Sequence, residues 1–201
     1  MMIVRGELPP GSPVRARDLK EIFGVSHIPI REALRTLEGE GLIKYQSHRG
    51  AVPTEISLSE LEEVYALRRM IECDAARRSA PNYTDEHLSQ LEASLVALET
   101  THAQDRHGEE FFAAHGEFHW LLLQPYAGVY TERLLRQLWA ASRRYIHMSI
   151  ATRPFPTVGH HREIFEAALA RDADLVTTRL DDHLRITEDS LKDAWVTRSP
   201  A

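Results

Sequence analysis

Histidine is the most conspicuous chemical feature of the chain, with eleven copies among 201 residues. His115 and His119 are four residues apart in a stretch with helical periodicity, so both side chains project from one face of the expected helix. Such a pair can bind one metal ion, although this spacing is also common among ordinary core and surface residues. His161 and His183 add one candidate ligand from each of two later helical stretches. Neutral imidazoles suit a divalent transition metal, zinc or nickel in particular.

The N-terminal quarter of the chain contains the elements of a winged helix-turn-helix. Apolar periodicity indicates a first helix over residues 15–23, which a glycine ends. Ser26 is a good N-cap for a second helix that runs to about Leu37. Two short strands, at 42–45 and 51–54, flank a glycine-containing turn and indicate a β-hairpin.

Basic and polar side chains lie where such a module would meet DNA. The second helix would place its N-terminal residues against base edges in the major groove, where an arginine can bind a guanine edge or a phosphate. The first helix and the hairpin tip could reach the backbone or the minor groove. Surface arginines look similar on many small helical domains, but their combination with these ordered elements favours DNA binding. The candidate DNA-binding residues are Arg17, Ser26, His27, Arg31, Arg35, His48 and Arg49.

From residue 57 onward the sequence shows only helical patterns. Ser57 and Glu60 form a capping box at the start of the first of them. We expect an antiparallel all-α bundle of about six helices, near residues 57–80, 84–103, 108–123, 129–150, 158–171 and 173–195. The fold class is therefore mainly α, with a winged helix-turn-helix domain over residues 1–56 and a helical domain over residues 57–201.

Composition and charge narrow the function classes. The net charge is −6, but it is unevenly distributed. Residues 1–56 carry eight Lys and Arg against seven Asp and Glu, whereas residues 57–201 carry 16 Lys and Arg against 23 Asp and Glu. Only the N-terminal part could therefore approach a phosphate backbone without strong repulsion. No apolar run approaches the roughly 18 residues that cross a bilayer, and the start lacks a signal-peptide pattern. The single cysteine, Cys73, excludes an intrachain disulfide and a Cys-cluster zinc site. We expect a cytoplasmic protein with no membrane partner.

The N-terminal quarter resembles the DNA-binding domain of GntR-type bacterial transcription regulators. The resemblance spans residues 3–53 and rests on Gly6-x-Leu8-x-Pro10-Gly11, Gly24-Val25-Ser26, Pro29-x-Arg31-Glu32-Ala33-Leu34, Leu37-Glu38-x-x-Gly41-Leu42-Ile43 and Arg49-Gly50. It implies DNA contacts by Arg17 and Arg31. A third arginine usually follows the serine, but His27 stands there, so this contact should be weaker or the operator preference different.

Members of this family usually have a further helix before the turn that contains Gly6, and the opening MMIVRG is too short to form it. Either the chain begins upstream of this methionine or the protein manages without that helix. Without it, apolar residues such as Leu19 and Leu34 would lie exposed. We therefore expect weaker DNA binding than that of a chain extended upstream.

Residues 58–195 resemble the FCD ligand-binding domain of the FadR-like branch of this family. The matching motifs are Tyr65-x-x-Arg68-x-x-x-Glu72, His115-x-x-Phe118-His119-x-x-Leu122, His161-x-x-Ile164-x-x-Ala167, Asp172-Ala173 and His183-Leu184. The resemblance implies a metal site formed by His119, His161 and His183, with His115 where an aspartate is typical. Motif position favours His161 over the neighbouring His160. An all-nitrogen site should favour zinc or nickel over oxygen-seeking ions such as manganese.

In FCD domains a small organic acid can bind beside the metal, which points to arginines as partners of its carboxylate. Arg68 matches the family arginine that points into the cavity. The alternative role for Arg68 is an ion pair with Glu72, four residues along the same helix. Arg143, or its neighbour Arg144, is a candidate for a second positive group.

Together these features predict a homodimeric regulator that binds a double-stranded DNA operator and represses transcription until a small organic acid binds. One alternative is a metal-responsive regulator in which the ion itself is the effector. Another is a zinc hydrolase that uses the histidines to activate water. The hydrolase lacks an obvious general base because Glu117 projects from another side of the helix than the histidine pair, and the chain contains no GxSxG, P-loop or GxGxxG motif.

Overall fold

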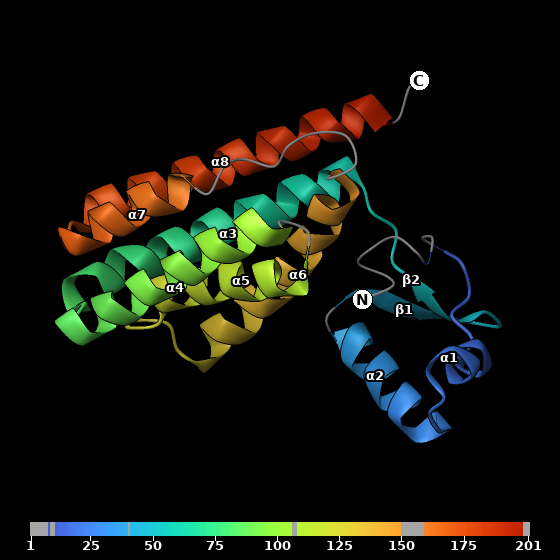
Figure 1. Ribbon diagram of the computed structural model, residues 1–201. Coiled ribbons are helices and arrows are strands. Elements are labelled where there is room, and N and C mark those ends of the chain that lie inside the picture. The colour runs from blue at the N-terminus through green and yellow to red at the C-terminus, as the bar shows by residue number, and fades with distance from the viewer. Residues whose placement is uncertain (1–7, 9–10, 40, 106–107, 150–158, 199–201) are drawn as a thin grey trace.

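The computed structural model describes residues 8, 11–39, 41–105, 108–149 and 159–198. Its N-terminal elements are α1 (Ala16–Phe23), α2 (His27–Gly39), β1 (Ile43–Gln46) and β2 (Gly50–Pro53) (Figure 1). Their order is the one predicted from the sequence, and each strand is displaced by a single residue from its predicted position. The winged helix-turn-helix is thereby confirmed.

The turn between α1 and α2 depends on Gly24. Its φ of 65° lies in the left-handed region, which glycine adopts without strain, and its amide donates to the carbonyl of Lys20 at 2.9 Å. α2 begins directly after Ser26. Its two buried residues then pack in a small core, whose members are Val14, Ile30, Leu34, Ile43 and Ala51.

The expectation that Leu34 is exposed is wrong. This side chain is 5% exposed because it faces Val14 and the hairpin, and Leu19 is half-buried against the same core. The large apolar side chains left exposed in this part of the structure are Ile22, Phe23, Val25 and Ile28, around the turn between the two helices, and Tyr45 on β1.

β1 and β2 pair antiparallel, with Ile43 opposite Pro53 and Gln46 opposite Gly50. His48 in the turn has a φ of 64° and Gly50 has a φ of 75°, so the chain reverses through two left-handed residues. Val52 is fully buried, which anchors one face of the hairpin while its tip stays exposed.

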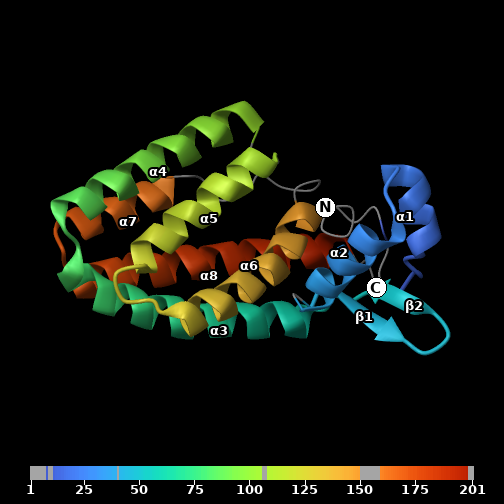
Figure 2. The ribbon, with the colours of Figure 1, turned by 90° about the horizontal axis from the view of Figure 1, so that it is seen from below.

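Six α-helices form the rest of the described structure, in agreement with the predicted number. They are α3 (Leu58–Ser79), α4 (Asp85–Asp105), α5 (Glu109–Leu123), α6 (Val129–Ser149), α7 (Gly159–Leu169) and α8 (Ala173–Arg198), with the 3-10 turn η1 (Ala80–Asn82) after α3. Figures 1 and 2 show α3 and α8 side by side along the bundle, α4 beside α5, and α7 packed on α8.

Side-chain caps fix two of the helix starts. The hydroxyl of Ser57 accepts from the amide of Glu60 at 3.1 Å, as the capping box predicts for α3. Before α8, one carboxylate oxygen of Asp172 accepts from the amides of Asp174 and Leu175, each at 3.0 Å. These caps set where the long helices begin and therefore which residues face the interior.

The interior of the bundle is mostly aliphatic and aromatic, but several charged or titratable side chains are buried within it. Burying such groups costs free energy of folding unless they are paired, so their presence in the interior indicates a candidate functional site. They include Arg68, Glu72, His119, His161 and His183. Among the described helices, none combines the length and apolar character needed to cross a membrane.

Candidate metal centre and DNA-binding surface

Four histidines converge inside the bundle. α5 supplies His115 and His119, α7 supplies His161 and α8 supplies His183, and one potential ligand atom from each lies within 4.8 Å of the others. The ring centroids of His161 and His183 are 4.4 Å apart, and those of His115 and His119 are 4.6 Å apart. The structure therefore brings together all four predicted ligands, and it leaves His160 outside the group, as the motif position indicated.

The electrostatics of the cluster suit a cation. Burial, and then the neighbouring histidines, hold the pKa of His115 and of His183 well below the usual range, so these rings are neutral and can donate a lone pair. Nε2 of His119 and Nδ1 of His183 are buried with no hydrogen-bond partner among the described residues. Buried nitrogens without partners are rare in folded proteins, and a bound transition metal would satisfy them. The residues present thus fit a metal ion.

Glu72 on α3 contacts His119 of the cluster, and its position in the sequence did not mark it as a site residue. Its carboxylate lies 3.2 Å from Nδ1 of His119 and accepts hydrogen bonds from Arg68 at 2.7 Å and from Trp139 at 2.9 Å. Burial alone would raise the pKa of Glu72, but the charge of Arg68 and the contact with His119 outweigh it and lower the pKa to about 2. An ionised carboxylate beside Nδ1 leaves Nε2 of His119 available for a metal.

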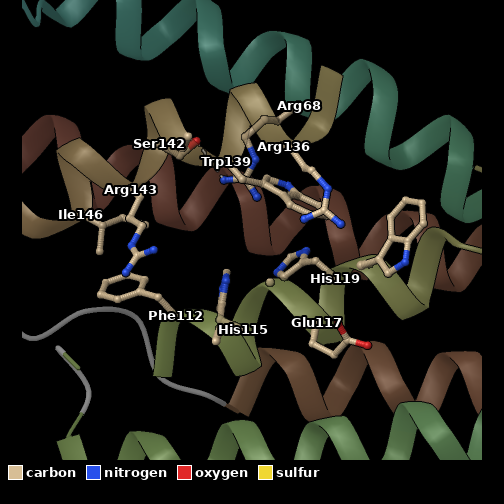
Figure 3. Close-up of a pocket in the computed structure, with 14 residues that line it drawn as sticks. Arg68, Phe112, His115, Glu117, His119, Arg136, Trp139, Ser142, Arg143 and Ile146 are labelled. Atoms are coloured by element: carbon tan, nitrogen blue, oxygen red, sulfur yellow. Dashed lines mark hydrogen bonds between the residues drawn. The ribbon is translucent and has the colours of Figure 1, made fainter. Parts of the chain in front are cut away.

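A cavity of about 470 Å³ opens beside the cluster, and we call it the arginine pocket because three arginines line it. Figure 3 shows His115 and His119 pointing from α5 toward Arg68 and Trp139 across this space. Its lining comes from α3, α5 and α6 and consists of Arg68, Phe112, Ala113, His115, Gly116, Glu117, His119, Trp120, Arg136, Trp139, Ala140, Ser142, Arg143 and Ile146.

The predicted arginines have distinct surroundings. Arg68 forms the ion pair with Glu72 that was considered as an alternative, and the same guanidinium lines the arginine pocket. Arg143 lies over the ring of Phe112 and donates to Glu109 at 2.5 Å, and it also lines the pocket. Arg144 is not among the lining residues. Arg136, which also lines the pocket, is a residue that sequence reasoning missed.

α6 connects the pocket with the N-terminal module. Arg143 on this helix lines the pocket, while the adjacent Arg144 donates to the hydroxyl and the carbonyl of Thr54, directly after β2. About two turns before Arg144, the side-chain amide of Gln137 donates to the carbonyl of Gly39 at the end of α2, at 2.9 Å. A single helix therefore contacts both the candidate ligand site and the module that carries α2.

The candidate DNA-binding residues lie on the exposed side of the N-terminal module. His27, Arg31 and Arg35 are four residues apart along α2, beside the buried face, and all three are exposed. Arg17 and Ser26 are exposed as well, and Nε of Arg17 lies 3.5 Å from a carboxylate oxygen of Asp18. At the hairpin, His48 and Arg49 are both exposed. The guanidinium of Arg49 also donates to the carbonyl of Gly11 at 2.8 Å, which ties the hairpin to the segment before α1.

Comparison with known sequence families identifies the family of the chain. Residues 63–186 match the family "FCD domain", and residues 1–52 match the family "Bacterial regulatory proteins, gntR family". The chain belongs to the GntR family and carries an FCD domain. This GntR protein is a DNA-binding transcriptional regulator and not an enzyme.

Named relatives of this GntR regulator include repressors. It is 31% identical to the HTH-type transcriptional repressor RspR of Escherichia coli strain K12 over 94% of its own chain and 84% of the relative. It is 29% identical to a probable D-xylose utilization operon transcriptional repressor of Paenarthrobacter nicotinovorans, over 92% and 81% of the two chains. Among solved structures, E. coli McbR/YncC shares the fold with a TM-score of 0.81 at 19% identity, covering 96% of this chain and 93% of that one.

Proposed function

We propose that this regulator binds a divalent metal through His115, His119, His161 and His183, and that a small organic acid beside the metal changes its affinity for its operator. The observation that carries the proposal is the position of the four-histidine cluster at the wall of a cavity lined by three arginines. A bound metal supplies positive charge and a coordination position for an anionic oxygen.

The donor set favours zinc or nickel, because all four ligands are imidazole nitrogens. An octahedral ion such as nickel would keep positions open for an effector. A tetrahedral zinc ion would be saturated by the four side chains. That saturation supports a second candidate function, in which the metal itself is the effector and the arginine pocket has no role in sensing.

Arg68 and Arg143 are the proposed partners of the effector carboxylate. They come from α3 and α6, so an anion between them would contact two helices of the bundle. Arg68 is held by Glu72 and by the hydroxyl of Ser142 at 3.3 Å, which fixes its guanidinium in the pocket wall before any ligand binds. Preorganised positive charge of this kind favours anion binding because little ordering is needed on association.

α6 is the proposed path from effector to DNA. An acid that binds more tightly to one position of α6 shifts the population of molecules toward that position. The contacts of Gln137 with Gly39 and of Arg144 with Thr54 would then move or release residues 1–56, the proposed DNA-reading domain. Residues 57–201 would serve sensing and dimerisation.

We propose a homodimer that acts as a repressor. One winged helix reads a single half-site, and two half-sites supply affinity and register. Arg17, Ser26, His27, Arg31, Arg35, His48 and Arg49 would contact the DNA, because they surround the exposed face of α2 and the hairpin tip.

The proposal can be tested with an operator selected from a random DNA pool. DNA affinity is measured by fluorescence anisotropy with metal-free and metal-loaded protein, each with and without a panel of small mono-, di- and tricarboxylates. We expect at least one acid to change the affinity of the metal-loaded protein by about 5–150-fold, the usual range for allosteric coupling. If metal alone changes the affinity and no acid adds to it, the metal-responsive function replaces the effector function. If neither has an effect, the sensing proposal is wrong.

Gly116→Leu provides the matched variant for the pocket. A Cβ atom at Gly116 meets no other atom within 4 Å, so a side chain can project into the arginine pocket without displacing the backbone. This variant should bind the metal normally and lose the response to the acid. An undiminished response would show that the acid binds elsewhere.

A further inference from the structure

A second cavity, of about 340 Å³, lies between α7 and α8, and we call it the α7–α8 pocket. It shares no lining residue with the arginine pocket. The arginine pocket reaches His115 and His119 of the four-histidine cluster, whereas the α7–α8 pocket reaches His183. The cluster can therefore be approached through two separate openings.

The α7–α8 pocket has charged side chains of both signs at its exposed end and an imidazole at its buried end. Glu163 and Asp182 are exposed, and His183 is buried. The two lining arginines are both paired with carboxylates, Arg179 with Glu163 at 3.5 Å and Arg185 with Asp181 at 2.6 Å. Asp182 forms no ion pair of its own among the described residues. Arg185, which interacts with Asp182 electrostatically, is already paired with Asp181, so Asp182 can attract a cation to the opening.

His160 lines the α7–α8 pocket beside His183. It is half-buried, its ring centroid is 6.1 Å from that of His183, and its Nδ1 is buried with no hydrogen-bond partner among the described residues. A buried nitrogen without a partner costs free energy, so its retention in this place calls for a function. His160 does not belong to the group of four ligands.

We infer that the α7–α8 pocket is the route by which a divalent metal enters and leaves the four-histidine centre. Asp182 attracts the hydrated cation, and His160 replaces one of its waters and passes the cation to His183. This inference rests on the proposed metal binding. It has a consequence for regulation: an acid bound over His115 and His119 in the arginine pocket leaves the metal route open.

The test is the rate of Zn²⁺ transfer, measured by stopped flow, between the full-length protein and a chromogenic chelator, in both directions. His160→Gln and Asp182→Asn remove the proposed relay and attracting groups, and Ile186→Trp narrows the α7–α8 pocket from its rim. Gly116→Leu narrows the arginine pocket instead. Glu92→Gln, which removes an exposed carboxylate on α4, is the matched control.

We expect His160→Gln and Ile186→Trp to slow both loading and release by about tenfold or more, with nearly unchanged equilibrium affinity, because a relay group alters the barrier and not the end states. Asp182→Asn should mainly slow loading and reduce its dependence on salt, since charge-lined openings raise on-rates by about 10–10³. Gly116→Leu and Glu92→Gln should load at the wild-type rate.

Two outcomes would overturn the inference while the metal site stands: wild-type rates in His160→Gln and Ile186→Trp, or slow loading in Gly116→Leu alone. A large loss of equilibrium affinity in His160→Gln would also overturn it, because His160 would then be a ligand and not a relay. Wild-type protein that takes up no Zn²⁺ would remove both the inference and the proposed metal site.

Discussion

Arg144 donates two hydrogen bonds to Thr54, one to the hydroxyl at 2.7 Å and one to the carbonyl at 2.5 Å. Thr54 follows the last strand of the N-terminal module, and Arg144 is adjacent on α6 to Arg143, which lines the arginine pocket. Two consecutive residues of one helix thus contact the candidate ligand site and the DNA-binding module.

Arg144→Ala should separate DNA binding from sensing. The variant removes both bonds to Thr54, so we expect a loss of about 1–3 kcal/mol in the free energy of unfolding and a smaller change in DNA affinity on adding metal and acid. Urea denaturation and fluorescence anisotropy measure the two effects. Arg133→Ala, an exposed arginine on α6, is the control. An allosteric response equal to that of the wild type would contradict the proposed path.

Glu72→Gln should weaken metal binding without removing a ligand. The substitution keeps the size of the side chain but removes the charge beside Nδ1 of His119. Loss of such an orienting group typically lowers metal affinity by about 10–100-fold. Competition with a chelator of known affinity gives the value, and Glu62→Gln, exposed on the same helix, is the control. Equal affinities of Glu72→Gln and wild type would show that Glu72 only balances the charge of Arg68.

The metal-free protein should lose stability as the pH falls through about 6.5, the usual pKa of histidine in an unfolded chain. Burial and the neighbouring histidines depress the pKa of His115 and of His183 in the folded state, so the unfolded chain binds more protons below that pH. The free energy of unfolding then rises with pH across this window and is greatest above it. Urea denaturation at several pH values between 5 and 8 tests this. His115→Gln should show a shallower dependence, and a flat wild-type profile would count against the buried, neutral cluster.

Arg31→Ala should weaken operator binding and leave sensing intact. Arg31 is exposed on α2, beside the face that packs in the small core. Loss of an arginine that contacts a base costs about 1–3 kcal/mol, which is about 5–150-fold in affinity, and relaxes specificity at that position. Anisotropy with the selected operator and with single-base variants of it measures both. A uniform loss over all base variants would instead assign Arg31 to a phosphate.

Local patterns in the sequence were sufficient to predict the order of the elements. The resemblance to FCD domains implied the four histidines that the structure brings together. Helical periodicity and caps depend on near neighbours, as the Ser57 cap of α3 shows. Glu72 was missed as a site residue because its spacing from Arg68 indicates only an ion pair. Its contacts with His119 and Trp139 depend on how α5 and α6 pack against α3. For Leu34, the burial by Val14 and the hairpin likewise arises from tertiary contacts.

The metal content of purified protein tests the four-histidine centre most directly. Elemental analysis measures zinc and nickel in the wild type, in His119→Ala, in His183→Ala and in the control His87→Ala. We expect about one ion per chain in the wild type and the control, and clearly less in His119→Ala and His183→Ala, with lower thermal stability in both. Wild-type stoichiometry in both variants, or wild-type protein that holds no transition metal after incubation with zinc and nickel, would contradict the proposed centre.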